Sequence, residues 1–484
     1  MDQGTTGTRT TLYDESGAFL ATAYRRTTTR HPAPGWNEQD GEELVASIEA
    51  TLAEALAQVE GAELVAIGLA NQGESVIAFD RRSGEPLSPA VLWSDRRSAG
   101  IVAELGGTEA QALVESRTGL PLDPYFSAGK IAWLLRHSEP VAEAARAGRL
   151  RVGTLESFFL HRLSGGAAFV TDPSTASRTQ LMDLDRRRFD PECAAVFGID
   201  LAHLPQIGPT VPEEPIATSL GAPVAASICD QQAALAAIGA VSPGETKVTY
   251  GTGCFIEANA GDTPVRPAGG LMPTFGWELG SGELAYAIEG GVFTAATAVD
   301  WLVELGIAGT AAEVDRLAGT GGPGETRFLP AFTGMGAPWW RPGAAGVLAG
   351  LRASTGRGDI AYAVLEGIAH RVADVLEAVE AEQGLLDVIR VDGGLSASRT
   401  LLQLQADLVG RPVAAAAERE GTAAGAAGFA AIGTGLLDLD GLAARARLVR
   451  RLDPAVSADE RGERRARWRE FVAASAALDP PRLP

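Results

Sequence analysis

The chain has 484 residues, more than one hydrophobic core usually supports, and this length predicts two large lobes. Its 46% hydrophobic and 21% charged residues are typical of a globular protein and exclude a fibrous or extensively disordered chain. The net charge of −20 argues against a nucleic-acid partner, because nucleic-acid backbones are bound by basic surfaces. Any phosphate must therefore be bound locally.

Cysteine spacing suits a reducing compartment, and the hydropathy of the chain indicates neither a membrane helix nor a signal peptide. The three cysteines, Cys193, Cys229 and Cys254, stand far apart and show no metal-ligand spacing. No apolar run approaches the ~20 residues that a membrane helix needs, and the polar start from Asp2 onward is unlike a signal peptide. We therefore expect a cytoplasmic protein without a membrane or nucleic-acid partner.

The N-terminal half opens as a β-meander. A Gly/Thr turn within residues 2–8 precedes β-branched residues, and a second turn follows at residues 14–17. Residue patterns predict, in chain order, strands over 9–13 and 18–24, a helix over 41–60 and a buried strand over 64–69. Polar residues 71–74 follow the last of these strands and suggest a site there.

Further along, a strand predicted over residues 224–227 leads to Asp230. Helices are predicted over residues 131–136, 141–148 and 233–240. Asp230 lies between the strand and the last helix, where open α/β sheets place ligand-contacting groups, and its carboxylate can accept a hydroxyl proton. A helix N-cap is the alternative explanation for an Asp at this position.

The second half repeats the opening pattern and predicts a second lobe. The repeat consists of a strand over 246–250, a Gly-Thr-Gly turn at 251–253 and a strand over 254–258. We place an N-terminal lobe at residues 1–240 and a C-terminal lobe at residues 241–484. The Ala/Gly-rich composition of residues 413–432 predicts one tightly packed helix.

The two Gly/Thr turns, one in each half, suggest a phosphate clamp. Glycine lets backbone N–H groups approach oxygen atoms closely, and threonine hydroxyls add donors. Arg9 adds a positive charge beside the first turn. Each turn taken alone is also explained as an ordinary hairpin, which needs glycine in any case.

Two further signals concern the rest of a ligand. Asp392-Gly393-Gly394 follows a predicted strand, so a nucleotide base or sugar can lie against exposed backbone there, although a tight strand-to-helix turn explains the pattern as well. Trp93, Tyr125 and Phe255 can form aromatic walls for a small ligand, but a single aromatic side chain is more often part of a core.

Taken in order, these segments and several others form a long series of motifs. The series is Asp2-Gln3-Gly4-Thr5-Thr6 with Arg9, Pro34-Gly35-Trp36, Asp123-Pro124-Tyr125-Phe126-Ser127 with Lys130 and Trp133, Gly153-Thr154, Thr171-Asp172, Ala176-Ser177-Arg178-Thr179, Asp230-Gln231-Gln232-Ala233-Ala234, Thr249-Tyr250-Gly251-Thr252-Gly253-Cys254-Phe255, Glu289-Gly290, Phe332-Thr333-Gly334 with Gly336-Ala337-Pro338, and Asp392-Gly393-Gly394. It resembles the sugar and polyol kinase family named for its FGGY motif, and most closely the glycerol kinases within that family, over nearly the whole chain.

This resemblance implies an α/β protein of the actin and sugar-kinase superfamily, with two ribonuclease-H-like lobes and ATP in the cleft between them. It implies ATP-dependent phosphorylation of a small, uncharged polyol, with glycerol to glycerol 3-phosphate as the best match. By the same resemblance, Asp230 is the general base, and Asp2 helps to hold a Mg²⁺ ion through water. The expected assembly is a homodimer or homotetramer.

The remaining site residues also come from the resemblance. Those assigned to the nucleotide are Thr5, Thr6, Arg9 and Thr252 at the phosphates, with Gly394 and Ser398 near the adenosine. Those assigned to the polyol are Glu74, Trp93, Tyr125, Asp230, Gln231 and Phe255. Aromatic faces suit the hydrocarbon side of a polyol, while carboxylates and an amide exchange hydrogen bonds with its hydroxyls.

The chain also departs from the family pattern. Gly73 stands where glycerol kinases usually carry the Arg that precedes this Glu, so a polyol-contacting charge is missing. Ala296, Asp300 and Ser398 stand where Gly, Gln and Asn are common near the nucleotide. The loop at 215–224 is shorter than the one through which some relatives bind a sugar bisphosphate inhibitor. The family has a complete strand before Asp2, and we expect the natural start to lie upstream.

Three alternatives to glycerol phosphorylation stay open. A kinase for a longer polyol or sugar with four or five carbons is favoured by Gly73, and an inactive nucleotide-dependent regulator is disfavoured by the intact Asp230 and Arg9. An actin-like ATPase or chaperone fits least, because the chain lacks an added peptide-binding domain.

Overall fold

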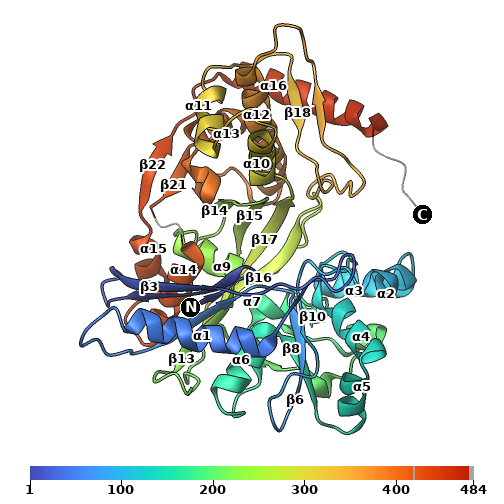
Figure 1. Cartoon of the computed structure of the whole chain (residues 1–484), viewed down its shortest axis with the longest axis vertical. Helices are drawn as coiled ribbons and strands as arrows, with labels where there is room; N and C mark the ends of the chain where they lie inside the picture. The colour runs from blue at the N-terminus through green and yellow to red at the C-terminus, as the bar shows by residue number, and fades with distance from the viewer. Residues whose placement is uncertain (418–419, 479–484) are drawn as a thin grey trace.

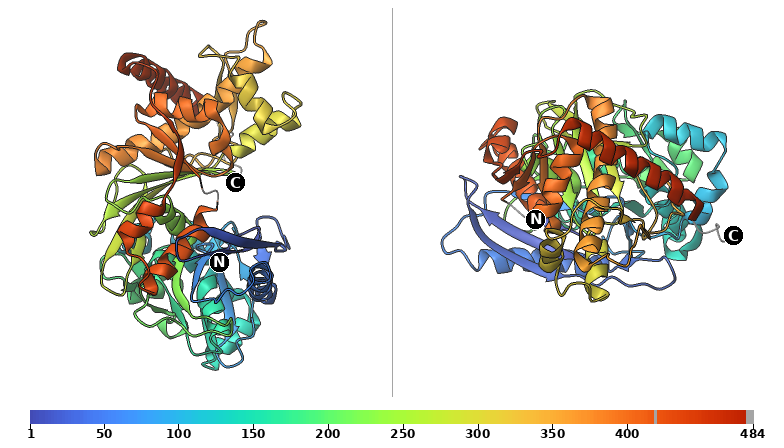
Figure 2. Two further views of the ribbon diagram at one scale, coloured as in Figure 1. Left: turned by 90° about the vertical axis from the view of Figure 1, so that its left-hand side faces the viewer. Right: turned by 90° about the horizontal axis from the view of Figure 1, so that it is seen from above.

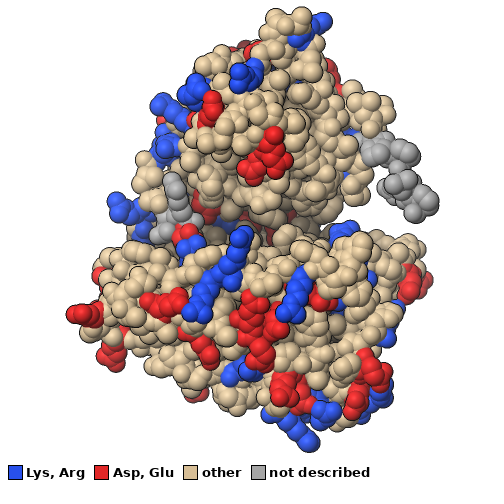
Figure 3. Space-filling model, viewed as in Figure 1, with Lys and Arg blue, Asp and Glu red and all other residues tan. Residues whose placement is uncertain are grey.

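In the computed structural model, the described residues, 1–417 and 420–478, form two lobes that lie one above the other (Figure 1). The space-filling view shows that the surface is hollowed between the lobes and that acidic and basic side chains are mixed on this face (Figure 3). The lower lobe contains the N-terminus, and the upper lobe contains most of the second half of the chain (Figure 1).

A five-stranded sheet in the order β13-β5-β1-β2-β3 forms the centre of the lower lobe. Its strands are β1 (Asp2–Gln3), β2 (Gly7–Tyr13), β3 (Phe19–Arg26), β5 (Ile67–Asn71) and β13 (Val224–Cys229). The β-branched and apolar residues of β2 and β3 pair antiparallel, as the predicted meander requires. β5 lies parallel to both β1 and β13, so the carboxyl ends of these three strands meet at one edge of the sheet.

Helices and small sheets complete the lower lobe. α1 (Gly41–Leu56) begins at Asp40, whose side chain accepts hydrogen bonds from the next helical N–H groups, and packs on β2 and β3. A second sheet runs in the order β4 (Glu38–Gln39), β7 (Ala90–Val91), β6 (Val76–Asp80), β8 (Leu150–Thr154). Two-stranded pairs are β9 (Val170–Thr171) with β12 (Gln206–Ile207), and β10 (Met182–Asp183) with β11 (Arg188–Phe189).

The remaining helices of the first half surround these sheets. They are α2 (Ala99–Leu105), α3 (Glu109–Thr118), α4 (Ser127–His137), α5 (Glu139–Arg146), α6 (Leu155–Leu163), α7 (Pro173–Ala176), α8 (Pro191–Phe197), η1 (Leu201–His203) and α9 (Asp230–Ala237). The helix predicted over 233–240 therefore begins three residues earlier, at Asp230 itself, and Asp230 is not its N-cap, because Cys229 takes that position.

The upper lobe is built on a seven-stranded sheet in the order β16-β17-β15-β14-β20-β21-β22. Its strands are β14 (Thr246–Tyr250), β15 (Cys254–Gly261), β16 (Met272–Glu278), β17 (Leu284–Val292), β20 (Ile389–Asp392), β21 (Val413–Ala416) and β22 (Leu448–Leu452). The other elements are α10 (Ala296–Glu304), α11 (Ala311–Ala318), β18 (Arg327–Leu329), β19 (Val347–Ala349), α12 (Arg357–Gln383), η2 (Gly394–Ala397), α13 (Arg399–Val409), α16 (Ala458–Ser475) and η3 (Ala476–Leu478). Seen from above, α16 crosses the outer surface of this lobe (Figure 2).

The prediction of one helix over 413–432 is wrong. Residues Val413–Ala416 form β21, and α14 (Gly421–Gly433) begins after it. α14 and α15 (Leu439–Arg445) pack on α9 of the lower lobe, and both views place them there (Figures 1 and 2). Gly425 permits this approach, because a Cβ there would lie 1.9 Å from the carbonyl oxygen of Ala233.

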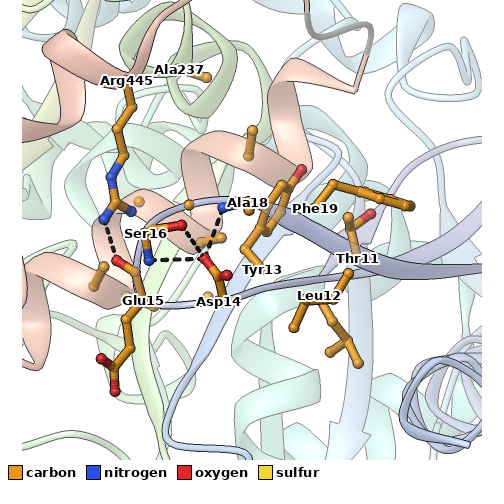
Figure 4. Close-up of a pocket in the computed structure, with 18 of the residues that line it drawn as sticks. Thr11, Leu12, Tyr13, Asp14, Glu15, Ser16, Ala18, Phe19, Ala237 and Arg445 are labelled. Atoms are coloured by element: carbon orange, nitrogen blue, oxygen red, sulfur yellow. Dashed lines mark hydrogen bonds between the residues drawn. The ribbon is translucent and has the colours of Figure 1, made fainter. Parts of the chain in front are cut away.

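A cavity of about 1010 Å³ lies in the lower lobe between β2, α14 and residues 62–68 (Figure 4). The short strand β1 lies between β2 and β5 and pairs with them only through Asp2 and Gln3. The rest of β2 and the rest of β5 therefore have no β1 residue paired between them. Arg445 donates to the carbonyl oxygen of Glu15 at the rim, at 2.5 Å. None of the predicted site residues lines this cavity, so it is not the candidate active site.

Candidate active site

The candidate acceptor residues gather where β5 and β13 end. Cys229 at the end of β13 pairs with Asn71 at the end of β5, so the segments that follow them run side by side. These segments carry Glu74 and Asp230. Along the chain, more than half of the residues of the lower lobe lie between the two. Asp2 lies in the neighbouring strand, opposite Ala70. The parallel sheet thus brings three carboxylates to one edge, as strand ends in open α/β sheets do.

Asp230 is the first residue of α9, and its carboxylate has a raised pKa. Its Oδ1 accepts a hydrogen bond of 2.7 Å from the backbone N–H of Gln231. Burial, together with the nearby negative charges of Asp2 and Glu74, raises the pKa of Asp230 to about 7. A carboxylate with a pKa near neutrality is a suitable general base, because it is ionised at neutral pH yet holds a proton well.

Arg178 joins the two lobes through buried ion pairs. Its Nε donates to Glu74 Oε1 at 2.6 Å, and its Nη1 lies 3.1 Å from Glu289 Oε2 on β17. The exposed fractions of the Arg178 and Glu74 side chains are 2% and 7%. Burial raises the pKa of Glu74, whereas Arg178 lowers it. The sequence places Arg178 within a family motif but does not indicate this contact, which spans 104 residues.

Aromatic side chains form one wall beside this cluster. The rings of Trp93 and Tyr125 meet edge to face with centroids 5.8 Å apart. The Arg178 guanidinium lies 5.9 Å from the Tyr125 ring centroid, so the wall continues into the charged cluster. Trp93 is oriented by its Nε1, which donates to Thr5 Oγ1 at 2.8 Å. Three predicted residues, Trp93, Tyr125 and Thr5, therefore lie together.

Phe255 lies in the upper lobe. It lies on β15, two residues before Glu257, so both side chains project from the same face of the strand. The β14 residues paired with them are Thr249 and Lys247. Lys247 Nζ donates to Gln231 Oε1 of the lower lobe at 3.0 Å, which connects this face with the acceptor residues.

The space beside Gly73 is filled in this chain. A Cβ at position 73 would lie 2.9 Å from Cys229 Sγ, which is closer than side chains pack. Cys229 is buried, and its Sγ lies 3.7 Å from Asp230 Oδ1. Cys229 Sγ therefore occupies the space next to the Gly73 backbone, a contact that the sequence does not show.

The predicted phosphate residues lie around the two Gly/Thr turns. Arg9 on β2 is only partly buried, and its Nε lies 2.9 Å from Glu420 Oε2. Thr252 lies in the turn between β14 and β15. Thr249 Oγ1 and Asp392 Oδ1 are buried without a hydrogen-bond partner among the described residues. Buried polar atoms of this kind are usually paired, so these two mark a place for a polar ligand.

The predicted adenosine residues follow β20. Gly393 has a φ of 82°, and a Cβ there would lie 2.5 Å from the Tyr250 carbonyl oxygen, so glycine is required for this turn. Gly394 begins η2 and has open space in front of its backbone. The Ser398 hydroxyl is used within the fold: it accepts from the Leu401 N–H at 3.1 Å and donates to Asp315 Oδ1 at 2.5 Å.

The residues present fit a Mg²⁺ ion held in part by the nucleotide. Asp2 Oδ1 is buried and accepts no hydrogen bond from the described residues. Mg²⁺ prefers oxygen ligands and usually keeps several waters, with one or two carboxylates and substrate phosphates. No group of three or more His, Cys, Asp or Glu side chains within the described ranges has metal-binding geometry. Asp2 therefore suits a water-mediated site and not an all-protein cage.

Comparison with known proteins identifies the family. Residues 1–237 match the model of the N-terminal domain of the FGGY family of carbohydrate kinases, and residues 246–434 match that of its C-terminal domain. The chain belongs to the FGGY family of carbohydrate kinases. The predicted family is confirmed, and the boundary that we placed between residues 240 and 241 stays a prediction.

Individual members of the family match over almost the full chain. A glycerol kinase of Citrifermentans bemidjiense is 40% identical over 484 residues, covering 98% of this chain and 97% of that protein. The crystal structure of Plasmodium falciparum glycerol kinase with ADP superposes with a TM-score of 0.93 at 27% identity, covering 98% and 97% of the two chains. The crystal structure of a xylulose kinase from Rhodospirillum rubrum superposes with a TM-score of 0.87 at 26% identity, covering 99% of this chain and 98% of that chain.

These matches confirm the predicted sugar-kinase fold and kinase activity, and they indicate that the enzyme uses a nucleotide. None of the helices in the described part of the chain is long and apolar enough to cross a membrane.

Proposed function

We propose that this kinase phosphorylates glycerol with ATP and Mg²⁺ and releases glycerol 3-phosphate and ADP. The observation that carries the proposal is the half-buried Asp230 carboxylate beside Gln231, in a cluster of side chains that also contains Glu74, with the Trp93–Tyr125 wall beside it. A small polyol offers hydroxyls for the first three groups and an apolar edge for the rings. The relatives with about 40% identity over the full chain carry the name glycerol kinase.

Asp230 performs the proton transfer in this proposal. One terminal hydroxyl of glycerol donates to its carboxylate, and that proton passes to Asp230 as the hydroxyl oxygen bonds to the γ-phosphorus of ATP. The bond between the γ-phosphorus and the oxygen that bridges to the β-phosphate breaks, and ADP leaves with that electron pair. Asp230 later returns the proton to solvent. Its pKa of about 7 suits both halves of the cycle.

The other residues orient the reactants. Arg178 holds Glu74 in place, so the Glu74 carboxylate can accept hydrogen bonds from the hydroxyls that do not react. Arg9, Thr5, Thr6 and Thr252 supply donors to the phosphates from the two turns. Asp2 would hold a Mg²⁺ ion through water, and the ion would supply positive charge to offset that of the phosphates. For Arg9 this role requires exchange of its present partner, Glu420, for a phosphate oxygen.

Gly394 is proposed to lie against the adenosine, where its exposed backbone can accept a flat ring. Ser398 is proposed to act there through its backbone, because its hydroxyl already caps α13. We further propose a cytoplasmic enzyme that assembles as a homodimer or homotetramer.

A panel of acceptors tests the proposal directly. ADP release is measured with the purified protein, ATP and Mg²⁺, and with glycerol, tetritols, pentitols and ketoses in turn. We expect the highest kcat/KM with glycerol and no ADP release that depends on acceptor when Asp230 is replaced by Asn. A higher kcat/KM for a ketose or a five-carbon polyol would show that the acceptor is wrong. Absence of turnover with every acceptor would favour the regulatory alternative.

A further inference from the structure

A buried charged pair lies behind the acceptor residues, on the strands that carry the second phosphate turn. Lys247 on β14 and Glu257 on β15 are register partners, and their Nζ and Oε2 atoms are 3.5 Å apart. Both side chains have an exposed fraction of 0%. Burying two charges is costly and gives little net stability by itself, so such a pair calls for an explanation beyond stability.

Lysine is scarce in this chain, which makes its positions informative. Of 41 Lys and Arg residues, only Lys130 and Lys247 are lysines, and both are fully buried beside acceptor residues. Lys130 Nζ donates to the backbone oxygens of Glu74 and Tyr125. A lysine ammonium is a compact point donor, whereas arginine presents a wide planar fork. Both lysines thus place a compact ammonium group in a closed space.

The contact of Lys247 with Gln231 fixes the orientation of an amide. Lys247 Nζ lies 3.0 Å from Gln231 Oε1, and an ammonium group can only donate. The amide oxygen of Gln231 must therefore face Lys247, and its NH₂ group must face the opposite way. Gln231 follows Asp230 in the first turn of α9, and its backbone N–H donates to the Asp230 carboxylate, so the two residues are held side by side.

We infer that Lys247, held by Glu257, is a positioning residue that turns the Gln231 amide so that it donates to the acceptor hydroxyl. A hydroxyl oxygen that accepts from Gln231 keeps its own proton free to donate to Asp230. The reverse amide orientation would place a carbonyl oxygen there, which would compete with Asp230 for that proton. The inference rests on the proposed function and adds residues to it for which the family motifs give no role.

Glu257 is the acidic partner that holds Lys247 in place. Neither oxygen of Glu257 has a hydrogen-bond partner among the described residues, and Lys247 is the cation next to it. Burial raises the pKa of Glu257 above its ordinary value, although the positive charge of Lys247 acts in the opposite direction. Arg178 and Glu289 also act on Glu257, so the pair belongs to the same charged cluster as Glu74.

A double-mutant cycle tests the inference. Lys247→Met and Gln231→Ala are made singly and together, and kcat and KM are measured for glycerol and for ATP. We expect each single variant to lower kcat/KM for glycerol by about tenfold or more, since a charge-assisted hydrogen bond is lost or misdirected. If Lys247 acts through Gln231, Lys247→Met adds almost nothing in the Gln231→Ala background. KM for ATP should stay within about twofold, because no nucleotide contact changes.

Two further variants separate positioning from damage to the fold. Lys247→Met/Glu257→Leu removes both charges, so the protein carries no unpaired buried charge, yet it should keep the loss in kcat/KM for glycerol. Asp374→Asn removes a buried charge elsewhere and should leave KM for glycerol unchanged per folded molecule. Additive effects in the cycle would overturn the inference, as would a folded double variant with the kinetics of the natural enzyme.

The proposed function can fail separately. If the natural chain turns over another small polyol faster than glycerol, the acceptor is wrong, and the same cycle with that polyol decides the role of Lys247. If no acceptor is turned over, the affinity for glycerol of the natural chain and of Lys247→Met is compared by calorimetry. Equal affinities, or binding by neither, would overturn the inference.

Discussion

Two buried charge clusters in this kinase differ in how completely they are paired. In the upper lobe, Asp374 on α12 accepts hydrogen bonds from Arg371 at 2.8 Å, Arg465 at 2.6 Å and Trp339 at 2.8 Å, and from Trp468. At the candidate site, by contrast, Asp2 Oδ1, Arg178 Nη1 and both Glu257 oxygens have no hydrogen-bond partner among the described residues. Both oxygens of Asp374 accept hydrogen bonds, and we call its cluster closed, although Arg371 Nε has no partner among the described residues. The site carboxylates lack such partners, and we call their cluster open.

The difference indicates two purposes. The Asp374 cluster ties α16 to α12 and is stacked on one side by His370 and Trp468, whose rings are 4.7 Å apart and almost parallel. A buried charge with all its partners present holds a fold together and has nothing left to offer a ligand. Unsatisfied polar atoms in the site cluster cost stability, and a bound polyol or nucleotide can satisfy them.

Loss of the base should give the largest effect. We expect Asp230→Asn to reduce kcat by ~10²–10⁴-fold, because the amide cannot accept the hydroxyl proton. ADP affinity should stay unchanged, since Asp230 contacts neither Gly/Thr turn. Steady-state kinetics and calorimetry with ADP are the measurements. A variant with near-normal kcat would contradict the assignment of Asp230.

The closed cluster predicts a large effect on stability alone. Asp374→Asn leaves the guanidinium groups of Arg371 and Arg465 without full compensation, and breaking a buried ion pair on one side costs about 3–5 kcal/mol. We expect the urea midpoint to fall while kcat and KM per folded molecule stay the same. A loss of glycerol affinity with unchanged stability would reverse the roles that we assign to the two clusters.

The open cluster predicts a pH-dependent gain in stability for Asp230→Asn. Burial raises the pKa of Asp230 from its ordinary 3.8 to about 7, so the folded protein binds this proton more tightly than the unfolded chain does. Ionised Asp230 therefore lowers stability by an amount that grows from about pH 4 to about pH 7 and is constant above. Removing it should stabilise the protein by roughly 1–4 kcal/mol at pH 8 and by almost nothing near pH 4.

Urea unfolding of metal-free, nucleotide-free protein at three pH values checks this, with EDTA present. A gain that is the same at all pH values would show that the Asn substitution acts through packing and not through the charge of Asp230.

Sequence patterns predicted local elements well and missed contacts between distant ones. The predicted strand over 246–250 coincides with β14, because a hairpin with a glycine turn is a short-range structure. Residues 413–416 were predicted as helix, but small apolar residues also suit β21, whose strand lies inside a sheet. Arg178 and Lys247 stand in recognisable segments, yet their contacts with Glu289 and Gln231 cross between the lobes and follow only from the fold.

Gly73 illustrates the same limit. The sequence shows that an arginine is missing, but it does not show that Cys229 fills the adjoining space, since strand pairing brings these residues together.

The smallest predicted effect concerns Gly73 and Cys229. From the sequence, restoring arginine at position 73 should improve glycerol over longer polyols, because a fork of donors would return to the pocket. The structure changes that expectation: in Gly73→Arg the new Cβ collides with Cys229 Sγ at 2.9 Å, so kcat/KM for glycerol should fall by about tenfold as Asp230 is displaced. Adding Cys229→Gly should relieve the collision and recover or exceed the natural kcat/KM for glycerol.

Cys229→Gly alone opens space and should improve kcat/KM for tetritols relative to glycerol by about a few-fold. Cys254→Ser, in a buried cysteine that does not contact Asp230, is the matched control and should not change the ratio between acceptors. If the ratio of kcat/KM for glycerol and tetritols is the same in all these variants, neither Gly73 nor Cys229 faces the acceptor.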